Sequence, residues 1–201
     1  MVETEDFELI GHQLCLDYVN TLDDRMGNPP HELLNSYTDL VSWSQKTHLL
    51  TDKQAEHLLE QARRHPADAS DVFQRALVLR EAIFRIFVAI ADRTSPAEDD
   101  LALLNGALAN AMCHACVVPK AEGFAWDWTD KENALDRMLW QVARSAADLL
   151  TSELLDDVRV CAAEDCMWLF FDTSKNHSRR WCDMKSCGNR AKARRHYARK
   201  M

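Results

Sequence analysis

The sequence predicts a mainly α-helical protein, in which a helical N-terminal domain with one small β-hairpin precedes a small cysteine-rich module of short strands and a basic helix. Three observations support this prediction. Glycine and proline are scarce, five each in 201 residues, which favours helices over a turn-rich all-β fold. Apolar residues recur at helical spacing through much of the chain. Four of the seven cysteines form two close pairs near the C-terminus.

The first predicted helices follow the apolar spacing and the capping signals. Residues 12–25 are expected to form the first, with its apolar side chains on one face and a polar stripe on another. Ser36-x-x-Asp39 and Thr51-Asp52 are typical N-terminal caps for the next two. Pro66 is expected to end the helix that begins at Thr51, because proline cannot continue a helix.

The longest apolar repeat predicts a helix over about residues 70–93. Ser95-Pro96 favours another start, with Ser95 as N-cap, for a helix reaching about Met112. Residues 115–128 contain two β-prone runs around Pro119–Gly123, which predicts a β-hairpin. Helix is expected again over 130–150, and residues 158–160 are a candidate strand leading to the first cysteine pair.

The cysteine pairs are Cys161-x4-Cys166 and Cys182-x4-Cys187, with fifteen residues between them. Two such pairs suit one tetrahedral Zn²⁺ ion held by four thiolates in a treble-clef- or ribbon-like module. An iron–sulfur cluster is the alternative, although cluster motifs more often use shorter spacings. Catalytic zinc is not expected, because four thiolates leave no position for water. The odd number of cysteines favours a reducing cytoplasm over a disulfide framework.

The net charge of −8 is unevenly distributed. Residues 172–201 hold ten Lys and Arg against two acids, a net charge of +8, so residues 1–171 sum to −16. A basic end of this kind predicts contact with nucleic acid. DNA is the first candidate partner, and single-stranded RNA, which the nearby tryptophans would suit, is the alternative. Docking of the basic end on the protein's own acidic part also remains open. The candidate nucleic-acid-binding residues are Lys175, Arg179, Arg180, Asn189, Arg190, Lys192, Arg195, His196, Arg199 and Lys200.

In the helical part, Asp17, Asn20, Thr21 and Asp24 lie at spacings of about one turn. They could line a pocket for a small-molecule effector, or serve an enzyme site. The competing interpretation is that they form caps and buried hydrogen bonds within the fold. The start of the chain lacks the features of a signal peptide, and no apolar run reaches membrane-spanning length, so a soluble, cytoplasmic protein without membrane contact is expected.

The run Cys187-Gly188-Asn189-Arg190, after Cys161-x4-Cys166 and before a basic helix, closely resembles the CGNR zinc finger family. The segment from Gly11 to Thr21, GHQLCLDYVNT, looks like the start of the helical ABATE domain that usually precedes that finger. Together the two matches cover nearly the whole chain. The resemblance implies a bacterial, stress-induced transcription regulator whose finger binds DNA.

These observations predict two parts. Residues 1–157 form a helical, ABATE-like domain for effector sensing or assembly, and residues 158–201 form a CGNR-type module with one structural zinc ion. The expected function is transcription regulation through DNA contact by the basic module. RNA binding or protein interaction is the alternative, and an enzyme in the helical domain is less favoured. A homodimer would suit a regulator of this type.

Overall fold

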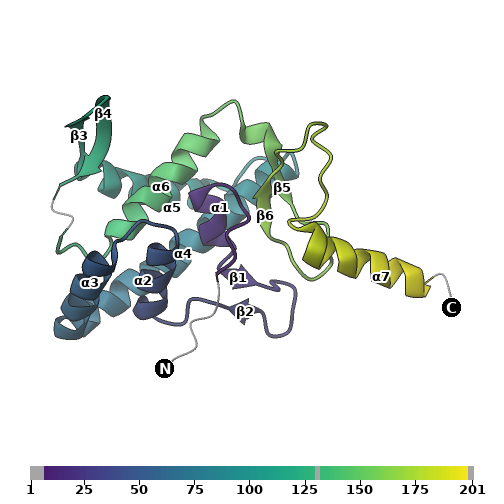
Figure 1. Cartoon of the computed structure of the whole chain (residues 1–201), viewed down its shortest axis with the longest axis horizontal. Helices are drawn as coiled ribbons and strands as arrows, with labels where there is room; N and C mark the ends of the chain where they lie inside the picture. Colours follow the sequence, from purple (N-terminus) through teal and green to yellow (C-terminus); the bar gives the residue numbers. More distant parts are fainter. Residues whose placement is uncertain (1–6, 130–131, 199–201) are drawn as a thin grey trace.

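The structure is a computed structural model, which describes residues 7–129 and 132–198. It is mainly helical, as predicted (Figure 1). The helices are α1 (Leu14–Val19), α2 (Tyr37–Lys46), α3 (Asp52–Arg64), α4 (Pro66–Ala91), α5 (Glu98–Cys113), α6 (Arg137–Leu150) and α7 (Asn189–Ala198). The strands form three antiparallel pairs: β1 (Leu22–Asp23) with β2 (His31–Glu32), β3 (Ala115–Lys120) with β4 (Gly123–Trp128), and β5 (Val158–Val160) with β6 (Leu169–Phe171).

Helix α4 is the centre of the helical domain. It is 26 residues long and packs against α1, α2, α3 and α5, as well as the β5–β6 pair. Its residues Ile83, Ile86 and Phe87 are fully buried. No helix among the described residues is long and apolar enough to cross a membrane.

The first helix is shorter than predicted, because it ends at Val19 instead of near residue 25. The Thr21 hydroxyl donates to the carbonyl of Tyr18 at 2.7 Å, which turns the chain. Leu22 and Asp23 then pair with β2, and Asp24 has a left-handed φ of 46° that a helix cannot contain. The polar stripe is therefore divided between a short helix and a turn.

The predicted helix starts are partly confirmed. Ser36 and Thr51 cap α2 and α3 as expected, the latter in a reciprocal capping box with Gln54. Pro66 follows the end of α3 but also occupies the first turn of α4, where its missing N–H costs nothing, so the long helix begins earlier than residue 70. Ser95 is not a cap, since α5 begins at Glu98 after Ala97.

Helix α6 begins at Arg137, later than the residue 130 that was predicted. Residues 130 and 131 lie outside the described part of the chain. The helix has one strongly apolar side, from which Val142, Ala143 and Ala146 are fully buried against the core. The apolar face predicted for this helix is therefore correct, although the helix begins later than predicted.

The β3–β4 hairpin is confirmed, and it stands out from the helical domain (Figure 1). Its register places Val117 opposite Trp126 and Pro119 opposite Phe124, so that one face is apolar. At the base of that face, Trp128 packs against Trp140 of α6, with the centres of the two rings 5.8 Å apart. Toward the tip, 79% of Phe124 is exposed.

The β5–β6 pair joins the cysteine-rich module to the helical domain. Val158 and Leu169 are buried in the same apolar core as α1 and α4. The Asn20 side chain fixes this arrangement, because its Nδ2 donates to the Leu169 carbonyl at 2.8 Å and its Oδ1 accepts the Leu169 N–H at 2.9 Å. The N–H of Phe171 also donates to Gly11. The module therefore has a fixed orientation on the helical domain.

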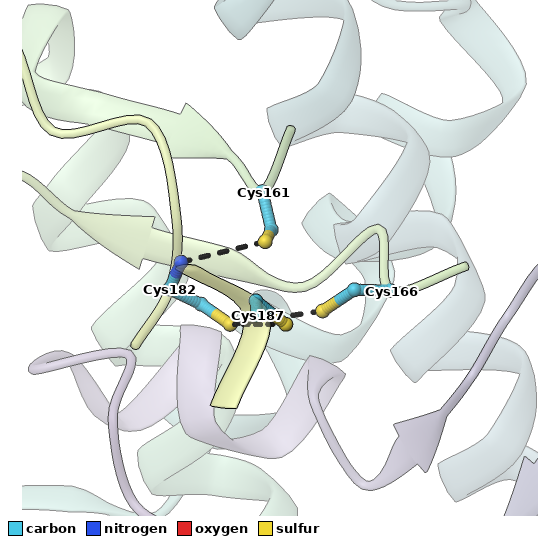
Figure 2. A group of neighbouring side chains, drawn as sticks. All are labelled: Cys161, Cys166, Cys182 and Cys187. Atoms are coloured by element: carbon cyan, nitrogen blue, oxygen red, sulfur yellow. Dashed lines mark hydrogen bonds between the residues drawn. The ribbon is translucent and has the colours of Figure 1, made fainter. Parts of the chain in front are cut away.

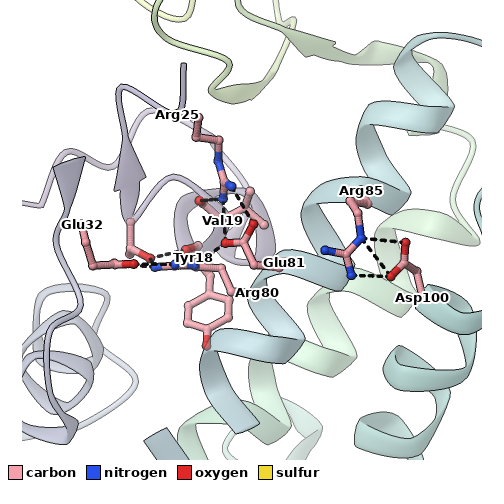
Figure 3. Close-up of polar contacts among 9 residues, drawn as sticks. Tyr18, Val19, Arg25, Glu32, Arg80, Glu81, Arg85 and Asp100 are labelled. Atoms are coloured by element: carbon pink, nitrogen blue, oxygen red, sulfur yellow. Dashed lines mark hydrogen bonds and ion pairs between the residues drawn. The ribbon is translucent and has the colours of Figure 1, made fainter. Parts of the chain in front are cut away.

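A buried ion-pair network holds β2 and the β1–β2 loop on α4 (Figure 3). Only 3% of the Arg80 side chain is exposed. Its two terminal nitrogens donate to the two oxygens of Glu32, both at 2.6 Å, and its Nε donates to Glu81. Arg25 donates to Glu81 at 2.7 Å and to the carbonyl of Val19 at 2.9 Å. Since buried charges need partners, this network is a structural requirement.

Candidate zinc centre

The four paired cysteines converge on one point (Figure 2). Their Sγ atoms all lie within 4.8 Å of one another, and all four side chains are buried. The Sγ atoms of Cys166 and Cys182 are 3.7 Å apart, and those of Cys182 and Cys187 are 3.6 Å apart. Four thiolates about 2.3 Å from a tetrahedral zinc ion would be about 3.8 Å from each other. The distances between the Sγ atoms therefore suit one Zn²⁺ ion and are too long for a disulfide bond.

The first cysteine pair lies on a tight turn that follows β5. The N–H of Cys161 donates to the carbonyl of Trp168 at 2.8 Å, which closes the turn, and Met167 has a left-handed φ of 61°. The N–H of Cys166 donates to Ala163 within it. The turn points both thiols to the same side.

Of the second pair, Cys187 lies in the single π-turn Met184–Gly188, which leads directly into α7, and Cys182 lies just before this turn. Asp183 caps this turn by accepting the N–H of Ser186 at 2.8 Å. Cys187 lies inside the turn, two residues before the helix begins. The last zinc ligand thus sets the position and direction of α7.

Two of the four thiols accept hydrogen bonds that favour their anionic form, whereas hydrogen bonding with Cys161 raises the pKa of Cys166 and of Cys182. Arg190 donates to Cys187 Sγ at 3.1 Å, and the N–H of Cys182 donates to Cys161 Sγ at 3.4 Å. Hydrogen bonds from Cys166 and Cys182 lower the pKa of Cys161. The hydrogen bond to Cys187 raises the pKa of Arg190 above its ordinary value. Because zinc binds thiolates, these contacts fit a metal centre.

The loop between the pairs is organised by the buried Asp172. Its carboxylate accepts the N–H groups of Ser174 and Arg179 at 3.0 and 2.9 Å. Phe170 is fully buried and Trp168 is 6% exposed, with the Arg179 guanidinium 4.7 Å from the centre of the Phe170 ring. Arg179 also donates to the carbonyls of Trp181 and Cys182. These side chains form the small core around the metal ligands.

The predicted nucleic-acid-binding residues fall into three groups. Arg179 is half-buried and holds the loop, as described above. The Arg195 side chain, Arg199 and Lys200 lie outside the part that the structure describes. Six are exposed on the surface of the module: Lys175, Arg180, Asn189, Arg190, Lys192 and His196.

Helix α7 extends away from the helical domain, toward the C-terminus of the chain (Figure 1). Two of its arginines contact the turn of the first cysteine pair: Arg194 donates to Asp165 at 2.9 Å, and Arg190 lies 3.7 Å from the same carboxylate. Arg194 also donates to Glu164 at 3.3 Å. The sequence did not reveal these ion pairs, because the residues are about thirty positions apart. In the described residues, the main contacts of α7 are with the Met184–Gly188 turn of its own module.

Three of the four polar residues proposed for an effector pocket make hydrogen bonds within the fold. Asn20 binds Leu169, as described above, and Thr21 accepts from Arg80 at 3.2 Å. Asp17 accepts the N–H of Gly11 at 2.7 Å, and Asp24 lies in the turn after β1 with its Oδ1 buried and without a hydrogen bond. The hydrogen bonds of Asp17, Asn20 and Thr21 are of the kind that the competing interpretation expects, and the effector pocket at this stripe stays a prediction.

Burial raises the pKa of Asp17 to about 6 from its ordinary value of 3.8. The folded protein therefore holds this proton more tightly than the unfolded chain does, and Asp17's contribution to stability falls as the pH rises from about 4 to about 6. Asp17→Asn keeps the acceptor for Gly11 and should stabilise the protein at pH 7 by up to about 3 kcal/mol. Urea unfolding at pH 4, 5, 6 and 7 would measure this difference.

The control for this prediction is Asp68→Asn, an exposed acid in the first turn of α4. It should show no comparable gain between pH 4 and pH 6. An Asp17→Asn variant whose advantage over the wild type is the same at every pH would contradict the assigned burial effect.

Comparison with protein families now identifies both parts. Residues 12–153 match the ABATE family, described as "Putative stress-induced transcription regulator", and residues 158–200 match the CGNR zinc finger. A comparison with curated proteins finds no match. The four cysteines within the matched finger form one structural zinc site. The chain belongs to the ABATE family and carries a CGNR zinc finger at its C-terminal end.

Proposed function

We propose that the protein is a transcription regulator that contacts DNA through its zinc module, residues 158–201. The observation that carries this proposal is the placement of α7, which begins two residues after the last zinc ligand, Cys187, and extends away from the acidic helical domain (Figure 1). Zinc then holds a basic helix in one orientation, with Lys192 and His196 exposed along it. A rigid helix of this kind suits contacts to phosphates.

The charge of the module supports a polyanionic partner. Residues 172–201 carry a net charge of +8. A Zn²⁺ ion with four thiolates adds about −2, which lowers this excess without reversing it. Arg180, on the loop beside α7, is exposed and stacks 5.5 Å from the centre of the Trp181 ring. It extends the basic surface beyond the helix itself.

Duplex DNA is favoured over single-stranded RNA by the burial of the aromatic side chains between the two cysteine pairs, although Tyr197 on α7 is 69% exposed. Base stacking requires an exposed ring face. Trp168 is only 6% exposed and Phe170 is fully buried, so both serve the core of the module. Trp181 is half-buried and already stacked by Arg180. The basic helix is therefore the surface that we assign to nucleic acid.

Lys192→Ala and Arg180→Ala test this assignment in the full-length, zinc-loaded protein. Each should weaken binding to duplex DNA about three- to tenfold. Each should also reduce the slope of the logarithm of the association constant against the logarithm of the salt concentration by about one, because one phosphate contact is lost. Fluorescence anisotropy with a labelled duplex would measure both quantities. Lys120→Ala, on the exposed β3–β4 hairpin, is the matched control and should bind as the wild type does. Wild-type affinity in both module variants would refute the interface.

A further inference from the structure

Helices α4, α5 and α6 enclose a groove of about 790 Å³ in the helical domain. No residue of the zinc module contributes to its wall. The volume is within the range of about 300–1,000 Å³ that small-molecule sites occupy. The groove is mostly apolar, and the side chains that shape it include Val78, Leu103, Leu139 and Trp140.

The groove exists because α5 presents small residues at its floor, namely Ala102, Gly106 and Ala107. A Cβ atom added at Gly106 would meet no other atom within 4 Å. Apolar side chains on both sides are left in contact with solvent, since Val78 is 50% and Leu103 is 42% exposed. An apolar molecule bound there would remove this surface from water, which is favourable.

The charged groups of the groove are predominantly acidic. Its wall contains the carboxylates of Asp99 and Asp136 and the guanidinium of Arg75. Arg75 is already bound by Asp71 at 2.9 Å and lies 3.6 Å from Asp136. Asp136 also accepts from Asn110 at 3.1 Å. The one positive charge is therefore shared by two carboxylates, and Asp99 adds a further negative charge.

We infer that this groove is a binding site for a small cationic amphiphile, a molecule with a flat apolar body and one positive charge. The apolar body would lie between α4 and α5, over Gly106, and the positive group would lie near Asp99 at the N-terminal end of α5, since Asp136 at the other end already faces Arg75. The net charge of −16 over residues 1–171 adds a long-range attraction for such a cation.

The same charges disfavour a second copy of the chain as the occupant. A two-fold contact through this surface would bring the groove of each copy against that of the other. The carboxylates of Asp99 and Asp136 in one copy would then lie near those of the other, and like charges repel. The ligand-binding proposal does not depend on DNA binding, so the two can be tested separately.

Rhodamine 6G, a cationic aromatic dye, is a suitable probe for the full-length, zinc-loaded protein in the absence of DNA. Its fluorescence anisotropy should rise to saturation at one dye per chain. Gly106→Leu should lower the affinity at least tenfold, because the new side chain fills the groove. The substitution also replaces glycine within a helix by a strong helix former, so the fold should be retained. Ala109→Leu places the same side chain on an exposed part of α5 that does not line the groove, and it should leave the affinity unchanged.

Charge selectivity is tested with the anionic dye anilinonaphthalene sulfonate. It should bind at least tenfold more weakly than rhodamine 6G, and Asp99→Asn should weaken rhodamine binding roughly two- to fivefold. Equal affinity for the two dyes, or equal binding by Gly106→Leu and the wild type, would overturn the proposal. A change of oligomeric state in Gly106→Leu, measured by sedimentation velocity, would show that a second copy covers the groove instead.

Discussion

Replacing Cys182 with serine should abolish stoichiometric zinc binding and unfold most of the described chain from Asp172 to Ala198. Apart from the ligands, the core around the metal contains few buried side chains, chiefly Ala163, Trp168 and Phe170. Zinc contributes about 10–16 kcal/mol in comparable small fingers, which so small a core cannot replace. Metal analysis should fall from one zinc per chain to nearly none. Limited proteolysis should cut the loop and α7 rapidly.

The helical domain of this variant should remain folded, because α1 to α6 retain their own core. Its melting temperature should fall by a few degrees, since the β5–β6 pair loses support on one side while Asn20 still binds Leu169. Cys113→Ser is the matched control: this cysteine is exposed at the end of α5, and its replacement should change neither zinc content nor proteolysis. A Cys182→Ser variant that keeps a full zinc ion and a protected tail would refute the four-thiolate site.

Arg80→Ala should destabilise the whole protein by about 3–5 kcal/mol, because it leaves the carboxylate of Glu32 without its bidentate partner in a largely buried setting. Thr21 and Glu81 lose a donor as well. For a chain of this length, the melting temperature should fall by roughly 10 °C. Thermal and urea unfolding would measure the loss.

Two comparisons test whether the loss of stability comes from the unpaired carboxylate of Glu32. Arg64→Ala removes an exposed arginine that pairs with Glu60, and it should cost less than about 0.5 kcal/mol. Removing both partners of the buried pair, as in Arg80→Met with Glu32→Gln, should cost less than Arg80→Ala alone, because no unpaired carboxylate remains. Equal losses for Arg80→Ala and Arg64→Ala would show that the network is not structurally important.

The features that could be predicted from the sequence are local. Thr51 caps its helix through residues three positions away, and the β3–β4 hairpin follows from its own turn and β-prone runs. The zinc ligands could also be predicted locally, because a short spacing within each of the two cysteine pairs identifies them. In each case the pattern and its consequence lie within a few residues of each other along the chain.

The features that could not be predicted depend on distant partners. Asn20, just after α1, binds Leu169, which is 149 positions away. Arg80 pairs with Glu32 across 48 positions, and a single sequence does not show which of many charges will meet. The groove beside Gly106 depends on how α4, α5 and α6 pack, so the pattern of polar residues near Asp17 directed attention to another part of the domain.

The most direct test of the central claim is the salt dependence of DNA binding by the full-length, zinc-loaded protein. The logarithm of the association constant should fall linearly with the logarithm of the salt concentration. Three to five phosphate contacts from the exposed basic residues of the module would give a slope of roughly −3 to −4.5. No binding at low salt, or an affinity that does not change with salt, would contradict the proposal that zinc positions α7 for contact with DNA.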